Sequence, residues 1–277
     1  TAASAMRYQN RDDLVLIEID PAAEVTALFT QNKFRAPPVE LAIAHLQAAT
    51  PRYLIINAGN ANAGTGSAGM QAAEKPCLDV ANQCVVNSNQ VLPFSTGVIG
   101  ELLDSDKIKL CLADLQQNLS EDHWLQAAAA ILTTDIVAKA QSKQIILNGK
   151  AITITGMTKG SGMISPNMAT MLAYVATDLA ISKDVLKRLL SEMVEQSFNS
   201  ITVDSDTSTN DACVLIASGN AKLNYADLTP AQQLEFEAAL RDVMQTLAQS
   251  IVRDGEGATK FVTVQVATAA DKALAKQ

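Results

Sequence analysis

Residues 144–178 read QIILNGKAITITGMTKGSGMISPNMATMLAYVATD and contain the strongest fold signal in the chain. Asn148-Gly149 is the pair that a two-residue hairpin turn with positive φ favours, and β-branched residues flank it on both sides. Residues 144–156 are therefore predicted to form a β-hairpin, which leads into a glycine-containing segment and then into the apolar run from Met171 to Ala176. Thr170, at the junction, has no obvious structural role.

The rest of the chain alternates between strand and helix patterns. A helix is predicted after Ser182, a plausible N-cap, and a second begins at Thr229-Pro230, where Gln232 completes a capping box. Runs rich in branched residues and bounded by turn residues predict further strands at 14–20, 53–59, 211–218 and 260–269. These elements indicate an α/β or α+β protein.

Composition narrows the class of protein. Hydrophobic residues make up 48% of the 277 residues and charged residues 18%, which is typical of a globular chain. A net charge of −8 without a block of Lys or Arg argues against nucleic acid or an anionic membrane as a partner. With no run of about 20 apolar residues and no secretory signal at the start, we expect a cytoplasmic protein that acts on small molecules.

Several common motifs fail on their context. Only two histidines and no C-x-x-C pair are present, so no metal site is expected. Gly64 to Gly69 matches G-x-G-x-x-G, but residues 80–100 contain no acidic residue to bind a ribose, and a flexible glycine-rich loop is the favoured interpretation. DSDTSTND (204–211) lacks the glycine and glutamate of a calcium loop and is interpreted as a hydrogen-bonded turn.

One chemical role would explain Thr170. A threonine hydroxyl becomes a nucleophile when chain cleavage leaves the threonine N-terminal, because its own α-amine then acts as the base. That amine has a reference pKa of about 7.7 to 8.0, so no histidine is needed. Gly160, Gly162 and Pro166 could hold the Ala169-Thr170 bond in a strained, attackable geometry. Taken alone, most Ala-Thr pairs are inert.

A family resemblance adds weight to this hypothesis. KGSGMISPNMATML (159–172) closely resembles the autocleavage motif of the ornithine acetyltransferase (glutamate N-acetyltransferase) family of arginine biosynthesis. Four more stretches resemble signatures of this family in the same order and are spread along most of the chain: NAGNANAGTG (57–66), STGVIG (95–100), SFNSITVDSDTSTNDA (197–212) and DGEGATKF (254–261).

The resemblance implies a ping-pong acetyl transfer from N2-acetylornithine to glutamate through an acetyl group on Thr170. Thr96 and Gly97 match the family's oxyanion-stabilising pair, whose ordinary alternative is a tight turn after Pro93. The expected substrate contacts are Thr133, Lys159, Thr170 and Glu256. Without the family, Lys159 and Glu256 would be interpreted as solvated surface charges, and either Thr133 or Thr134 could be the contact.

The resemblance also implies an organisation for the chain. Cleavage would give an α chain of residues 1–169 and a β chain of residues 170–277, and the sequence is expected to lack the family's C-terminal segment. The implied fold is α/β, with stacked β-sheets flanked by helices in the N-terminal-nucleophile-like (ornithine acetyltransferase or DmpA-like) architecture. A heterotetramer is expected, with no cofactor or metal, and acetyl-CoA stays open as a second donor.

Two alternatives from other reaction classes are retained. A related N-terminal-nucleophile aminopeptidase or amidase would pass the acyl group to water, and added glutamate would then not be acetylated. A nicotinamide-binding oxidoreductase would rest on Gly64 to Gly69 and would bind NAD or NADP.

Overall fold

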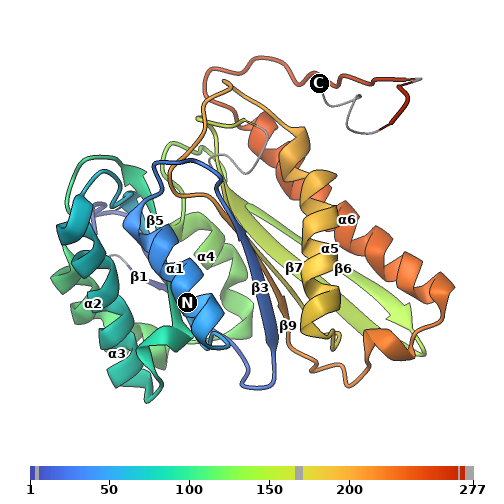
Figure 1. Cartoon of the computed structure of the whole chain (residues 1–277), viewed down its shortest axis with the longest axis horizontal. Helices are drawn as coiled ribbons and strands as arrows, with labels where there is room; N and C mark the ends of the chain where they lie inside the picture. The colour runs from blue at the N-terminus through green and yellow to red at the C-terminus, as the bar shows by residue number, and fades with distance from the viewer. Residues whose placement is uncertain (4–5, 166–170, 268, 272–277) are drawn as a thin grey trace.

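A computed structural model describes residues 1–3, 6–165, 171–267 and 269–271 (Figure 1). Its strands form a four-stranded sheet in the order β1-β2-β4-β5 and a five-stranded sheet in the order β3-β9-β8-β7-β6. The strands are β1 (Ala2–Ala3), β2 (Leu14–Glu18), β3 (Glu24–Phe29), β4 (Tyr53–Asn60), β5 (Val91–Val98), β6 (Lys139–Leu147), β7 (Lys150–Lys159), β8 (Leu172–Thr177) and β9 (Ala212–Ala217). The helices are α1 (Pro37–Ala48), α2 (Gly66–Cys84), α3 (Ser105–Gln117), α4 (Trp124–Ala130), α5 (Lys183–Glu195) and α6 (Pro230–Arg253).

The two sheets stack face to face. Phe94 of β5 and Tyr174 of β8 meet edge to face with ring centroids 5.3 Å apart. Ile56 and Leu92 of one sheet belong to the same buried cluster as Val214 of the other, so the space between the sheets is an apolar core. The predicted class, an α/β fold of stacked sheets flanked by helices, is confirmed.

Helices cover the outer face of each sheet (Figure 1). The apolar sides of α2 and α3 pack on the four-stranded sheet, and those of α5 and α6 pack on the five-stranded sheet. Both helices predicted in the second half of the chain are present. Thr229 and Gln232 form the predicted capping box of α6, whereas Ser182 stands at the N-cap of α5 without a side-chain capping bond.

The predicted hairpin organises the five-stranded sheet. Asn148 and Gly149 adopt positive φ values of 48° and 75°, and β6 and β7 pair antiparallel on either side of them. β7 then pairs with β8, so that Lys159, the last residue of β7, lies opposite Leu172, the first residue of β8. Leu172 in turn lies opposite Ala212, the first residue of β9. One end of this sheet therefore collects the predicted site segments.

Two local predictions were wrong. Residues 260–269 were expected to form a strand, but the described part of this segment pairs with no strand of either sheet, and Val262 and Val264 are 71% and 82% exposed. Alternating apolar residues form a strand only where another strand supplies hydrogen bonds. The flexible loop expected at Gly64 to Gly69 is also incorrect, because α2 begins at Gly66.

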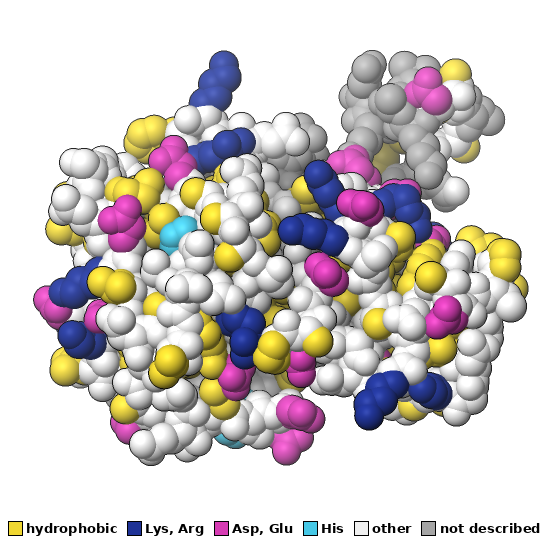
Figure 2. Space-filling model, turned by 60° about the horizontal axis from the view of Figure 1, so that its bottom comes forward, with side chains coloured by type: hydrophobic (Ala, Val, Ile, Leu, Met, Phe, Trp, Pro, Cys, Tyr) yellow, Lys and Arg dark blue, Asp and Glu magenta, His cyan; other side chains and the backbone are white. Residues whose placement is uncertain are grey.

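The surface agrees with the sequence-based view of charge. On the face that Figure 2 shows, Lys and Arg are interspersed with Asp and Glu rather than gathered into a patch of one sign. In the described part of the chain, no helix combines the length and hydropathy needed to span a bilayer.

Candidate active site

Lys159 and Thr96 come from different sheets and meet in the interior. Lys159 ends β7 and is 4% exposed, and Thr96 lies near the end of β5 and is 8% exposed. The Lys159 Nζ donates a hydrogen bond to the Thr96 Oγ1 at 3.3 Å. Two residues that the resemblance placed in one site are thus in direct contact, and Lys159 is a buried ammonium rather than a surface charge.

Gly97 follows Thr96 at an irregular point in the pairing of β4 and β5. The register shifts between Gly59 and Asn60, opposite Gly97, and Gly97 has a φ of +129°. A Cβ built on Gly97 would lie 2.6 Å from both the Gly59 Cα and the Asn60 nitrogen. Only glycine fits this position. The pair Thr96-Gly97 is therefore part of a distorted strand and not the tight turn that was its ordinary alternative.

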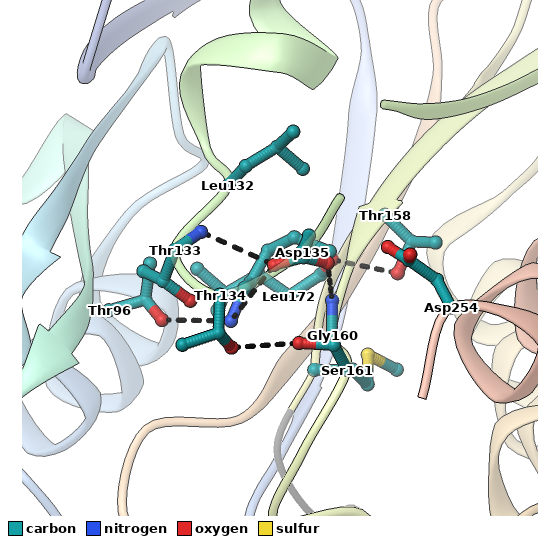
Figure 3. A network of polar contacts seen from close by, with 12 residues as sticks. Thr96, Leu132, Thr133, Thr134, Asp135, Thr158, Gly160, Ser161, Leu172 and Asp254 are labelled. Atoms are coloured by element: carbon teal, nitrogen blue, oxygen red, sulfur yellow. Dashed lines mark hydrogen bonds and ion pairs between the residues drawn. The ribbon is translucent and has the colours of Figure 1, made fainter. Parts of the chain in front are cut away.

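A buried carboxylate, Asp135, lies at the centre of the polar network drawn in Figure 3. Its Oδ1 accepts hydrogen bonds from the Lys139 Nζ at 2.7 Å and from the Gly160 nitrogen at 2.6 Å. Its Oδ2 accepts one from the Thr133 nitrogen at 3.2 Å and lies 3.8 Å from the Lys159 Nζ. The sequence analysis did not identify Asp135 as a site residue. The only local sign of its role was an opposite charge, Lys139, four residues further along the chain.

Burial and charge act in opposite directions on the two site groups. Burial lowers the pKa of Lys159 below the usual lysine value, and the nearby carboxylate of Asp135 partly offsets that effect. For Asp135, burial favours the neutral acid, but the ammonium groups of Lys159 and Lys139 outweigh burial and hold its pKa below 3.8. The site is therefore a compact arrangement of paired opposite charges.

Thr133 and Thr134 both belong to the network but differ in their contacts. The Thr134 hydroxyl and the Ser161 hydroxyl lie 2.8 Å apart, whereas Thr133 contacts Asp135 through its backbone nitrogen (Figure 3). Both threonines thus lie beside the turn that follows Lys159.

Glu256 reaches the site from the turn after α6. Its backbone nitrogen donates a hydrogen bond to the Ser161 carbonyl at 2.7 Å. Two residues earlier, Asp254 accepts hydrogen bonds from the Lys139 Nζ at 2.5 Å and from the Ile136 nitrogen at 3.0 Å. The end of α6 is therefore fastened to both the Asp135 segment and the Gly160–Gly162 turn. Glu256 itself is exposed, unlike Lys159, so the ordinary interpretation of a solvated charge fits Glu256 but not Lys159.

Ala169 and Thr170 lie outside the described residues, and so does the proposed boundary between residues 1–169 and 170–277. The described chain on either side is anchored by carboxylates. Asp204 accepts hydrogen bonds from the Met163 and Ile164 nitrogens, and the Asp211 Oδ1 accepts one from the Met171 nitrogen at 2.8 Å. Within 204–211, the Asp204 Oδ1 accepts a hydrogen bond from the Asp206 nitrogen at 3.3 Å and the Ser208 Oγ accepts one from the Asn210 nitrogen at 3.0 Å, which are the predicted side-chain turns. The segment also holds both flanks of the motif.

Three of the quoted motifs also meet at one side chain. The Asn210 Nδ2 donates hydrogen bonds to the Ala61 carbonyl at 2.7 Å and to the Ser95 carbonyl at 2.9 Å. Asn210 therefore ties the loop after β4 to the strand that carries Thr96 and Gly97. Among the described residues, no three His, Cys, Asp or Glu side chains are arranged to hold a metal ion.

The fold and the site define a class: an α/β sandwich whose two sheets bring a threonine-glycine pair and a buried lysine together at one end. Comparison with known proteins places it more closely. The chain belongs to the ArgJ family, whose model matches residues 1–277.

Curated relatives and a crystal structure agree with this assignment. The arginine biosynthesis bifunctional protein ArgJ of Psychrobacter arcticus is 54% identical over 266 residues, and that of Methylococcus capsulatus is 48% identical over 272 residues. The matched parts cover 95% and 98% of this chain, which spans 65% and 66% of the two relatives' length. The crystal structure of the Bacillus halodurans protein of that name is 32% identical with a TM-score of 0.53, covering 61% of this chain and 89% of the other.

Proposed function

We propose that this protein is an acetyltransferase of arginine biosynthesis, which carries an acetyl group from N2-acetylornithine to glutamate by way of Thr170. The observation that carries the proposal is the contact between Lys159 and Thr96 beside Gly97, at the end of the five-stranded sheet where Lys159 lies opposite Leu172. The proposal includes self-cleavage of the Ala169-Thr170 bond into chains of residues 1–169 and 170–277.

The contact between Lys159 and Thr96 suits Thr96 to oxyanion stabilisation. A hydroxyl has one hydrogen to donate and two lone pairs, and here a lone pair of Thr96 accepts from the lysine. The hydroxyl hydrogen is then available for the acetyl oxygen, where negative charge develops during attack. The nearby ammonium makes that hydrogen a better donor. Together with the Gly97 backbone, this arrangement would supply the charge stabilisation that acyl transfer requires.

The charges at the site suit an N-acetylated amino acid. Such a substrate has no free α-amine, so its recognisable groups are an α-carboxylate and, in ornithine, a cationic δ-amine. The Lys159 ammonium is the matching group for the carboxylate, and the Glu256 carboxylate is the matching group for the amine. Either Thr133 or Thr134 would add a hydroxyl contact beside them.

The chemistry at Thr170 proceeds in two balanced steps. The α-amine of Thr170 takes the hydroxyl proton, the oxygen attacks the acetyl carbonyl, and ornithine leaves with a proton returned to its amine. The glutamate amine then attacks the threonine ester and gives up a proton to the Thr170 α-amine, which returns it to the threonine oxygen as N-acetylglutamate leaves. The proposed chemistry requires no cofactor. We also propose a cytoplasmic location and a heterotetramer, with acetyl-CoA as an optional second acetyl donor. Family membership leaves the nicotinamide alternative without support.

The intact mass of the purified protein tests the proposal. Two fragments that meet at Ala169/Thr170 are expected, and Thr170→Ala should give one uncut chain, while Thr50→Ala, on the exposed loop between α1 and β4, should be cut normally. After brief reaction with N2-acetylornithine, one acetyl group should be on the fragment that begins at Thr170. Cleavage of Thr170→Ala at the parent rate would refute the mechanism, and release of free acetate without acetylation of added glutamate would identify an amidase.

A further inference from the structure

Asp135 occupies an unusual place for a carboxylate, because its side chain is fully buried and yet faces two lysines. It receives hydrogen bonds from three parts of the chain: its own segment through Thr133, β6 through Lys139, and the turn after β7 through Gly160. A carboxylate needs such partners when it is withdrawn from water.

Lys139 extends the network to the end of α6. Its ammonium lies between Asp135, at 2.7 Å, and Asp254, at 2.5 Å, with its side chain 1% exposed. The four buried charges balance: two carboxylates face two ammonium groups. Asp254 lies two residues before Glu256, the carboxylate that is predicted to recognise the substrate amine. The network therefore joins the turn after α6 to the end of β7, where Lys159 lies.

Four charged groups act on Lys159. The carboxylates of Asp135, Asp211 and Glu256 favour its charged form, and the Lys139 ammonium opposes it. Among described residues, Asp135 is the carboxylate within ion-pair distance of the Lys159 Nζ. A buried ammonium loses its hydration, so a carboxylate at this distance decides whether it stays charged at neutral pH and where it lies.

We propose that Asp135 is a positioning residue of the candidate site. Its carboxylate holds the Lys159 ammonium against Thr96, and it also fixes the turn after β7 through the Gly160 nitrogen. Lys139 and Asp254 fasten the Glu256 segment to the same carboxylate. The substrate consequences rest on the proposed function, whereas the coupling between Asp135 and Lys159 does not.

Asp135→Asn is the informative change because it keeps the size of the side chain. Its amide oxygen still accepts from Lys139 and Gly160, but the charge that faces Lys159 is lost. Asp254→Asn is the matched control, since it removes a carboxylate from the same network that pairs with Lys139 rather than with Lys159. The titration of Lys159 is then followed by NMR of the protein labelled with ¹⁵N-lysine, with Lys159→Arg to assign the signal.

The midpoint of the Lys159 titration should fall by about one to three pH units in Asp135→Asn and by less than half as much in Asp254→Asn. Equal shifts in the two variants, or no shift in Asp135→Asn, would overturn the proposal. If Asp135→Asn does not fold, Lys159→Met measures the same coupling from the other side, because the Asp135 carboxyl carbon should then titrate at higher pH. An unchanged Asp135 titration in that folded variant would equally overturn it.

Kinetics separate this inference from the proposed function. In Asp135→Asn the KM for both N2-acetylornithine and glutamate should rise as the pH is raised, whereas kcat at saturation should change less. Asp254→Asn should keep the parent's pH profile. A shifted Lys159 titration in a protein that transfers no acetyl group would refute the proposed function and leave the positioning role intact. Acetyl transfer with identical pH profiles in the parent and in Asp135→Asn would support the proposed function and refute the positioning role of Asp135.

Discussion

Glu256 occupies the space that a side chain at residue 162 would need. A Cβ built on Gly162 would lie 2.7 Å from the Glu256 Cδ and 2.9 Å from both of its carboxylate oxygens. Gly162 has no positive φ, so a side chain added there would disturb the Glu256 carboxylate rather than strain the backbone. The Glu256 carboxylate is therefore seated against the turn that follows Lys159, which brings the two predicted recognition charges beside the same short turn.

Gly162→Ala should displace the Glu256 carboxylate without unfolding the protein, because the clash involves the end of a flexible side chain. We expect the melting temperature to change little and the KM for N2-acetylornithine to rise more than the KM for glutamate, since only ornithine offers a cationic amine to Glu256. Steady-state kinetics with each substrate varied in turn would measure this.

The matched background for that test is Glu256→Ala, where no carboxylate is left to displace. Gly162→Ala should add almost nothing in that background, because the effects of two residues in contact are not additive. Full additivity of the two changes would contradict the contact as the cause.

Gly97→Ala should destabilise the fold directly. The new methyl group would meet the backbone of Gly59 and Asn60, which cannot move aside as a side chain can, and the residue would also keep a φ of +129°. Strain and overpacking together predict a loss of at least ~2 kcal/mol in the free energy of unfolding. Urea denaturation monitored by circular dichroism would measure it.

Gly149→Ala is the control for the conformational part of that cost. Gly149 also has a positive φ, but a Cβ there would meet no atom within 4 Å. It should therefore lose only about 1 kcal/mol. Equal losses at Gly97 and Gly149 would show that the close approach to β4 contributes nothing.

Asp135 should make stability depend on pH in the acid range. Its pKa in the folded protein is lower than the reference value of 3.8, so the unfolded chain binds its proton at higher pH than the folded chain does. The stabilisation is complete above that reference value and is lost as the pH falls through the lowered folded value. The difference in unfolding free energy between the parent and Asp135→Asn should thus shrink from pH 7 to pH 3. A difference that stays constant over that range would show that charge is not its origin.

The local elements were largely predictable from the sequence. Asn148-Gly149 specifies a hairpin because few other pairs tolerate two positive φ values, and Thr229 with Gln232 specifies a helix start through hydrogen bonds between near neighbours. The family resemblance also placed Thr96, Gly97, Lys159 and Glu256 in one site. In the structure Lys159 contacts Thr96, and Glu256 lies against the turn that follows Lys159. Thr170, the residue that suggested the chemistry, lies outside the described residues, and its role stays a prediction.

What only the tertiary structure decided depends on contacts between distant segments. Residues 260–269 carry a strand pattern but pair with no strand in the part of the chain that the structure describes, because pairing depends on a partner that a local pattern does not specify. A lysine such as Lys159 is expected at the surface when only its residue type is considered. Its burial follows from the stacking of the two sheets. The Asp135–Lys139–Asp254 network was missed for the same reason: a carboxylate is kept charged in the interior only by partners that folding brings to it, and Asp254 comes from a helix end far along the chain.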